Sequence, residues 1–100
     1  MRNPYDYYPT PEWCYQNLPI DWSQFEVALE PAAGDGRIVN FLQNKGITMD
    51  YCELQQGIDF FDWRGEYDLI ITNPPFSLAQ EFIEHALSMS TTVVMLLRIN

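Results

Sequence analysis

The sequence predicts a single α/β domain in which helices flank a parallel β-sheet. Short apolar runs rich in β-branched residues alternate along the chain with segments whose apolar residues recur at helical spacing. This alternation is typical of parallel strands joined by helical crossovers. The length of 100 residues and the apolar content of 47% suffice for one hydrophobic core, so residues 1–100 are expected to form one domain.

Four strands are expected, each an apolar run that stops at a polar, glycine-containing or proline-containing segment. The first run stops at Glu30-Pro31 and the third at Asn73-Pro74-Pro75, where prolines cannot continue a central strand. The four runs cover residues 25–29, 47–52, 67–72 and 91–97.

Two helices are expected before the third strand. In the first, residues 11–18, Thr10 would cap the amino end, and Pro11 suits the first turn because no N–H group is needed there. In the second, residues 37–45, apolar residues recur at helical spacing and Gly46 follows as a carboxyl-terminal cap.

A third helix is expected between the third and fourth strands. Ser77 is followed three residues later by Gln80, which is the spacing of a capping box, so Ser77 is expected to cap this helix. The apolar residues beyond it fall on one stripe and predict a buried face, made of Leu78, Ala79, Phe82, Ile83, Ala86 and Leu87. A helix in this connection again favours parallel strands.

The charge of the chain excludes one class of function. Five Lys and Arg residues stand against 14 Asp and Glu residues, so the formal net charge at pH 7 is −9. A protein that grips the nucleic-acid backbone through a basic patch needs more cations than this chain carries. The chain is therefore not an ordinary basic-patch nucleic-acid binder.

Further features indicate a cytoplasmic protein without a membrane span or a metal site. No run reaches the roughly 18 apolar residues of a membrane helix, and the first residues lack the apolar stretch of a signal peptide. Cys14 and Cys52 are expected to be reduced core residues, with pairing in an oxidising compartment as the alternative. His85 is the one histidine and has no cysteine at ligand spacing, so no metal is expected.

Four unusual segments follow or end the expected strands: residues 30–36, Glu53, residues 59–60 and residues 73–76. In an open parallel sheet, ligands bind beyond the carboxyl ends of the strands, near the point where the strand order reverses. All four segments are therefore expected on one edge of the sheet.

The loop at residues 30–36, Glu-Pro-Ala-Ala-Gly-Asp-Gly, combines small residues with two glycines. Glycine lets the backbone turn tightly and approach a ligand, because it has no Cβ atom. A dinucleotide-binding loop normally has a third glycine, and the acidic Glu30 at the strand end disfavours a phosphate. The loop is better suited to an ammonium group or a ribose hydroxyl; a plain strand-to-helix turn is the alternative.

Acidic residues near the ends of the next two segments could bind a nucleoside. Glu53 lies 17 residues beyond Gly36 and could accept hydrogen bonds from ribose hydroxyls, with Asp50 as a competing candidate. Asp59 could accept from an exocyclic amine while Phe60 packs against a purine. The alternatives are a solvated carboxylate at Glu53, and an exposed Asp59 beside a Phe60 that belongs to the core.

The segment Asn73-Pro74-Pro75-Phe76 is the most informative of the four. The two prolines stiffen the turn after the third strand, which leaves the Asn73 side-chain oxygen and the Pro74 carbonyl as fixed acceptors. An amine on a planar ring could donate to both and stack on Phe76. The alternative is a proline-rich turn whose phenylalanine is buried.

The glycine loop together with Asn73-Pro74-Pro75-Phe76 resembles the S-adenosylmethionine-dependent methyltransferases that methylate amino groups. The similarity is greatest to DNA adenine-N6 methyltransferases of the phage and prophage type, and it extends over nearly the whole chain. Residues 7–11, Tyr-Tyr-Pro-Thr-Pro, are similar to the family segment that precedes the glycine loop. The resemblance implies a Rossmann-like class I methyltransferase fold and methyl transfer to the exocyclic amine of adenine in DNA.

The resemblance also implies roles for individual residues around the cofactor S-adenosylmethionine. Tyr8 and Thr10 would close over the carboxylate and amine of its methionine part. Four residues of the loop would line the methionine and ribose: Glu30, Ala32, Gly34 and Gly36.

Beyond the methionine part, the resemblance implies that Glu53 holds the ribose hydroxyls. Asp59 would accept from the adenine amine of the cofactor, with Phe60 beside the ring. The catalytic turn would hold the target amine on Asn73 and Pro74 and stack the flipped base on Phe76, with Pro75 stiffening the corner. The implied transfer is direct, without a metal or a covalent enzyme intermediate.

The chain departs from the family in length and charge. Enzymes of this fold carry about seven strands, so the resemblance implies a truncated domain, either a fragment or a natural truncation, that lacks its target-recognition segment. The last strand would then leave an apolar edge open to self-association. With five cations, the chain is expected to bind a DNA substrate weakly.

Alternative functions remain at this point. The same turn could methylate RNA bases or glutamine side chains, although Phe76 favours a flat nucleobase. The chain could also be an inactive cofactor-binding fragment. An acidic decoy that mimics DNA is disfavoured, because the carboxylates of Glu30, Glu53 and Asp59 are better explained by a concave rim.

Overall fold

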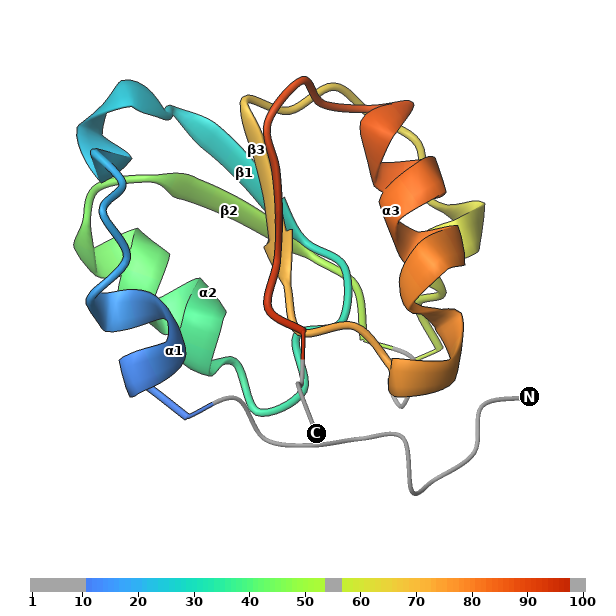
Figure 1. Ribbon diagram of the computed structural model, residues 1–100. Helices are drawn as coiled ribbons and strands as arrows, with labels where there is room; N and C mark the ends of the chain where they lie inside the picture. The colour runs from blue at the N-terminus through green and yellow to red at the C-terminus, as the bar shows by residue number, and fades with distance from the viewer. Residues whose placement is uncertain (1–10, 54–56, 98–100) are drawn as a thin grey trace.

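The computed structural model describes residues 11–53 and 57–97 of the chain. Four parallel strands form one sheet in the order β2-β1-β3-β4 (Figure 1). The strands are β1 (Val27–Glu30), β2 (Thr48–Tyr51), β3 (Leu69–Thr72) and β4 (Val93–Met95). The expected parallel sheet is confirmed, and β1 and β3 occupy its centre.

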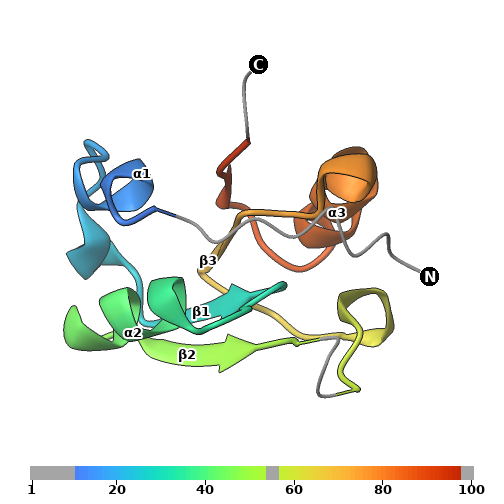
Figure 2. The same cartoon turned by 90° about the horizontal axis from the view of Figure 1, so that it is seen from below.

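Helices connect the paired strands and lie on both faces of the sheet (Figures 1 and 2). The helices are α1 (Trp13–Gln16), α2 (Arg37–Asn44) and α3 (Ala79–Leu87), with 3₁₀ turns η2 (Trp22–Gln24), η4 (Phe60–Asp62) and η5 (Phe76–Leu78). The chain is a small α/β domain that is compatible with a Rossmann-like fold.

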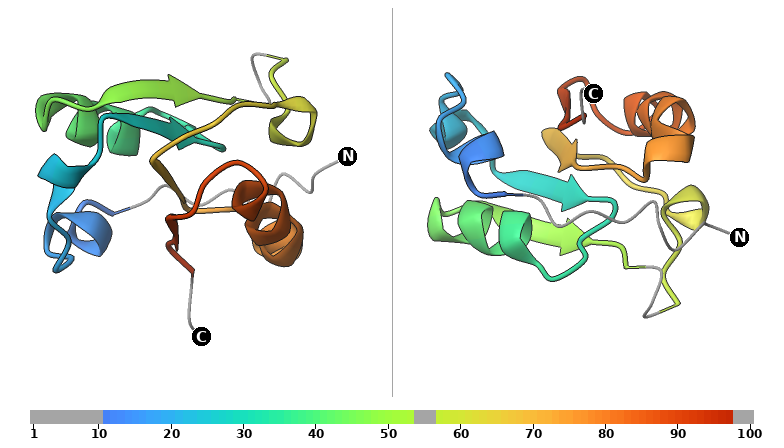
Figure 3. Two further views of the ribbon diagram at one scale, coloured as in Figure 1. Left: turned by 90° about the horizontal axis from the view of Figure 1, so that it is seen from above. Right: turned by 60° about the horizontal axis from the view of Figure 1, so that its bottom comes forward.

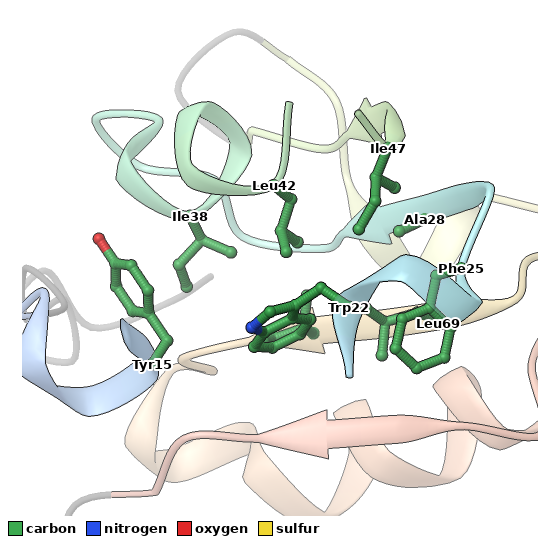
Figure 4. Close-up of a cluster of buried hydrophobic side chains, with 9 residues drawn as sticks. Tyr15, Trp22, Phe25, Ala28, Ile38, Leu42, Ile47 and Leu69 are labelled. Atoms are coloured by element: carbon green, nitrogen blue, oxygen red, sulfur yellow. The ribbon is translucent and has the colours of Figure 1, made fainter. Parts of the chain in front are cut away.

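One face of the sheet packs against α1, η2 and α2. Because side chains alternate along a strand, Ala28 of β1 and both Leu69 and Ile71 of β3 point to this face. Figure 4 shows most of the cluster that they form with side chains from the helical segments. Phe41 of α2 fixes the packing, since its ring lies 4.9 Å from the ring of Tyr15.

The opposite face packs against α3 and η4. Leu29 of β1 and Ile70 of β3 point to this face and are fully buried. The ring of Phe60 lies 4.9 Å from that of Phe82, and the ring of Phe61 lies 5.1 Å from it. This aromatic cluster joins the segment after β2 to the helix after β3.

The first strand begins two residues later than expected. The Asp21 carboxylate accepts from the amide of Ser23 and starts the turn η2, which places Phe25 in the core before the strand begins. The Asp68 carboxylate then accepts from the amides of Glu26 and Val27, at 2.9 and 3.1 Å. These contacts fix where β1 enters the sheet.

The starts of α1 and α3 differ from the expectation. The cap expected for α1 lies outside the described residues, and the cap expected for α3 is at another position. Helix α1 is shorter than expected and begins after Glu12, while Thr10 lies outside the part of the chain that the structure describes. No side chain caps α3, because the turn η5 runs into it from Pro75 and leaves Leu78 at the cap position. Ser77, expected at the cap position, lies instead within η5.

Two further expected segments agree with the structure only in part. Helix α2 ends as expected before Gly46, whose φ of 87° suits a carboxyl-terminal cap. In α3, Phe82 and Ala86 are buried, but Leu87 at its end is exposed. The apolar stripe of α3 thus stops one residue short of the prediction.

The two cysteines lie on opposite faces of the sheet and are not joined by a disulfide. Cys52 belongs to the cluster beneath α3, and Cys14 packs against the cluster beneath α2. None of the helices within residues 11–53 and 57–97 is long and apolar enough to cross a bilayer. The same residues bring together no three His, Cys, Asp or Glu side chains in a group that could hold a metal ion.

Candidate functional site

The glycine loop and the Asn73 turn leave the sheet from neighbouring central strands. β1 pairs with β2 on one side and with β3 on the other, so the strand order reverses between β1 and β3. Both strands are parallel, and the chain leaves both at the bottom of Figure 1 and at the front of Figure 3, right. The two segments therefore meet at the place where open α/β sheets bind ligands.

Glu30 ends β1 with a buried carboxyl group at this point. The side chain is only 1% exposed, and its Oε2 accepts from the amide of Ala32 at 2.5 Å. Burial raises the pKa of Glu30 to about 8, although the Ala32 amide and the Thr72 hydroxyl oppose the rise and the charge of Glu53 adds to it. No described residue gives this carboxyl a positively charged partner, and a buried carboxyl in that position favours a cationic ligand.

Thr72, the last residue of β3, is a member of this site that the sequence analysis missed. It is fully buried, and its hydroxyl lies beside the Glu30 carboxyl. That hydroxyl makes no hydrogen bond of ordinary geometry with any residue that the structure describes. Threonine is common in strands, so its presence in an apolar strand run does not indicate a functional site. The only signal in the sequence was that Thr72 directly precedes Asn73.

The glycine loop is tied to the end of β2 by two successive amides. The amide of Ala33 donates to the Cys52 carbonyl at 2.9 Å, and the amide of Gly34 donates to Oε2 of Glu53 at 2.5 Å. The Ala32 amide donates to Glu30 in the same way, so three successive amides of the loop are bound within the protein. A phosphate bound at a loop needs free amides, and these three are not available to one.

The described cations are engaged away from any anion site at this edge. Arg37 forms an ion pair with Asp35 at 2.7 Å, at the start of α2. Arg64 donates to main-chain carbonyls of its own loop, and the Lys45 ammonium lies 5.3 Å from the centre of the Phe41 ring. The edge of the sheet near the glycine loop is thus acidic.

In the segment after β2, Asp59 is half-buried, whereas its neighbour Phe60 lies in the core. The half-buried Asp59 accepts from the amide of Phe61 at 2.9 Å and caps η4. Phe60 is fully buried in the aromatic cluster beneath α3. Phe60 therefore follows the alternative interpretation, in which it belongs to the core, while its contact with a purine stays a prediction.

A chain of hydrogen bonds holds this segment against β2. The indole N–H of Trp63 donates to the Tyr67 hydroxyl at 2.8 Å, and that hydroxyl donates to Asp50 at 2.7 Å. Burial and the Asp50 carboxylate raise the pKa of Tyr67 to about 12. Asp50 is thus bound to Tyr67, whereas its competitor Glu53 lies at the glycine loop.

The Asn73 turn is stiff and presents an exposed ring. Pro74 and Pro75 are buried, Asn73 is half-buried, and the turn closes through the Leu78 amide, which donates to the Pro75 carbonyl at 3.0 Å. Phe76 is 63% exposed. The alternative in which this phenylalanine is buried is therefore wrong, and the ring is available for stacking.

The structure brings together most of the predicted site residues, but not all of them. Tyr8 and Thr10 lie outside the described residues. Asp59 and Phe60 lie apart, at the start of η4. The other predicted cofactor residues lie on the loop and just after β2, and the turn residues follow β3: Glu30, Ala32, Gly34, Gly36, Glu53, Asn73, Pro74, Pro75 and Phe76.

Replacement of Gly34 by valine is expected to abolish binding of S-adenosylmethionine. Gly34 has a φ of 57°, in the left-handed region that a β-branched residue adopts only with strain of roughly 1–2 kcal/mol. This strain falls on the residue whose amide Glu53 holds. Isothermal titration calorimetry measures the loss.

Gly46→Val is the matched control for this experiment. Gly46 has a similar φ of 87°, and a Cβ atom there meets nothing within 4 Å. It precedes β2, at the opposite edge of the sheet, so it carries comparable backbone strain without touching the loop. Equal affinity in Gly34→Val and the unchanged protein would remove the loop from the site.

Comparison with known proteins gives no relative from which a function could be transferred. No protein-family model matches this chain, and no curated protein or solved structure compared with it matches either.

Proposed function

We propose that the chain binds S-adenosylmethionine and transfers its methyl group to the exocyclic amine of adenine in DNA. One observation carries the proposal: the acidic glycine loop and the rigid Asn73 turn leave adjacent parallel strands where the strand order reverses. A donor and an acceptor held at these two segments would be neighbours, as direct group transfer requires.

The chemistry of the loop supports a cationic nucleoside rather than a nucleotide. The amides of Ala32 and Gly34 are bound to the carboxyl groups of Glu30 and Glu53, so they are not available to a pyrophosphate. Glu30 offers a buried carboxyl to a positive charge, and Glu53 reaches the same loop from β2. S-adenosylmethionine carries an ammonium and a sulfonium group, and it has a ribose diol without phosphates.

The Asn73 turn supports an amine as the acceptor. In the proposed reaction, the Asn73 side chain and the Pro74 carbonyl accept hydrogen bonds from the target amine and stabilise the positive charge that develops on nitrogen. The exposed Phe76 ring stacks on the base. When bound, S-adenosylmethionine supplies an electrophilic methyl group.

The proposal predicts selective cofactor binding and base-specific transfer. Calorimetry is expected to show binding of S-adenosylmethionine and none of NAD, because the amides of Ala32, Ala33 and Gly34 are already bound within the protein. Tritiated methyl groups are expected to appear in single-stranded and duplex DNA that contains adenine. Low salt favours detection, since the chain carries a net charge of −9.

Three further substrates serve as controls in the transfer assay. DNA in which every adenine is replaced by N6-methyladenine should accept no label at that amine. Label in RNA or in a glutamine peptide, and not in DNA, would show that the amine class is right and the substrate wrong. Absence of cofactor binding would overturn the proposed function.

A further inference from the structure

Within residues 11–53 and 57–97, no cation balances the buried carboxyl group of Glu30. Among the described residues, the Ala32 amide donates to it, the Thr72 hydroxyl lies beside it, and the charge that acts on it is the carboxylate of Glu53. The nearest basic side chain of the loop, Arg37, is paired with Asp35. A carboxylate in such surroundings gains stability by taking up a proton.

The Thr72 hydroxyl, beside Glu30, is a second buried polar group at this position. It is fully buried from the side of β3 and lacks a hydrogen-bond partner of ordinary geometry among the described residues. Buried hydroxyls are rarely left in this state, because the loss of water is not compensated. Two polar groups from adjacent strands, one acidic and one hydroxyl, thus meet with unused capacity for hydrogen bonds.

We propose that Glu30 carries a proton in the ligand-free protein and releases it to solvent when the cationic cofactor binds. The O–H bond of the carboxyl group breaks, the proton passes to the buffer, and the carboxylate then balances the positive charge of the ligand. This inference rests on the proposed function and adds a proton to its binding equilibrium. The raised pKa of Glu30, about 8, agrees with it.

The consequence is a binding affinity that depends on pH. Below a pH of about 8 the ligand must displace a proton, so affinity for S-adenosylmethionine is expected to rise about tenfold per pH unit between about pH 6 and pH 8. Above that range the carboxylate is already formed and this contribution disappears.

Calorimetry in two buffers of different ionisation enthalpy counts the protons released on binding. The unchanged protein is expected to release close to one proton more than Glu30→Gln, which keeps an acceptor for the Ala32 amide but has nothing to ionise. Subtracting the variant also removes any proton that the ligand's own amino group exchanges. Glu26→Gln, an exposed position at the other end of β1, is expected to behave as the unchanged protein.

The outcomes separate this inference from the function on which it rests. Equal proton counts for the unchanged protein and Glu30→Gln, with cofactor bound by both, would overturn the inference alone. Failure of the unchanged protein to bind S-adenosylmethionine at any pH in this range would overturn the proposed function, and the inference with it. Carbon NMR of the labelled Glu30 carboxyl adds a direct check, since a titration at its ordinary value would also overturn the inference.

Discussion

Replacement of Asn73 by alanine is expected to lower methyl transfer by about 100- to 1,000-fold, the cost of removing one oriented hydrogen-bonding group from a reacting centre. The affinity for S-adenosylmethionine is expected to stay within a few-fold of the unchanged protein, because the proposed role of Asn73 concerns the target amine. Its neighbours Pro74 and Pro75 are buried and keep the turn in place. Tritium transfer measures the first effect and calorimetry the second.

Two variants make this result interpretable. Asn73→Asp keeps a side-chain oxygen that can accept from the amine, so it should retain more activity than the alanine variant. Asn44→Ala removes the same group from an exposed position at the end of α2, away from the turn, and should leave transfer unchanged. A collapse of cofactor binding in Asn73→Ala would instead assign Asn73 to the cofactor.

Replacement of Glu30 by glutamine is expected to stabilise the fold in alkaline solution. In the folded protein the pKa of Glu30 is raised by burial from 4.5 to about 8. Between these values the folded state holds a proton that the unfolded state has lost, so its contribution to the unfolding free energy declines as pH rises. It is fully present below about pH 4.5 and lost at about pH 8 and above.

The variant lacks this decline, because glutamine does not ionise. At about pH 9 Glu30→Gln should therefore exceed the unchanged protein in unfolding free energy by a few kcal/mol, given about 1.4 kcal/mol for each unit of pKa shift. Urea denaturation at several pH values measures the difference, with Glu26→Gln as an exposed control. Parallel curves for Glu30→Gln and the unchanged protein would contradict a raised pKa.

Much of the fold could be predicted because the core residues follow simple periods. Alternation along β1 and β3 assigns Ala28 and Leu29 to opposite faces, and both are fully buried as this requires. Phe82 and Ala86 show the helical period on α3 in the same way. These periods can be predicted because burial of one face selects apolar residues along the whole segment.

The starts of segments were harder to predict because single hydrogen bonds decide them. β1 begins at Val27 because Asp68, about 40 residues away along the chain, accepts from the first amides. Ser77 loses its expected role because Pro75 starts a 3₁₀ turn that leads into α3. The sequence around a segment does not predict hydrogen-bond partners that are distant along the chain and become neighbours only in the folded protein.

In the candidate site, too, some residues could be predicted from the sequence and others could not. Glu30, Gly34 and Glu53 could be found from their places at strand ends, since topology alone gathers such residues. Thr72 could not, because its importance comes from burial beside Glu30 and not from its residue type. Phe60 shows the opposite problem, since an aromatic residue next to a carboxylate suits a purine site and a core equally well.

Hydrogen bonds within the protein tie the glycine loop to the end of β2. The backbone around Gly34 is held by Glu53, and that of Ala33 by Cys52, so a ligand need not order it on arrival. Binding to such a preorganised loop forfeits little conformational entropy, and more of the contact energy is left as affinity. Under the proposed function, recognition of the cofactor at this loop would thus be closer to lock-and-key than to induced fit.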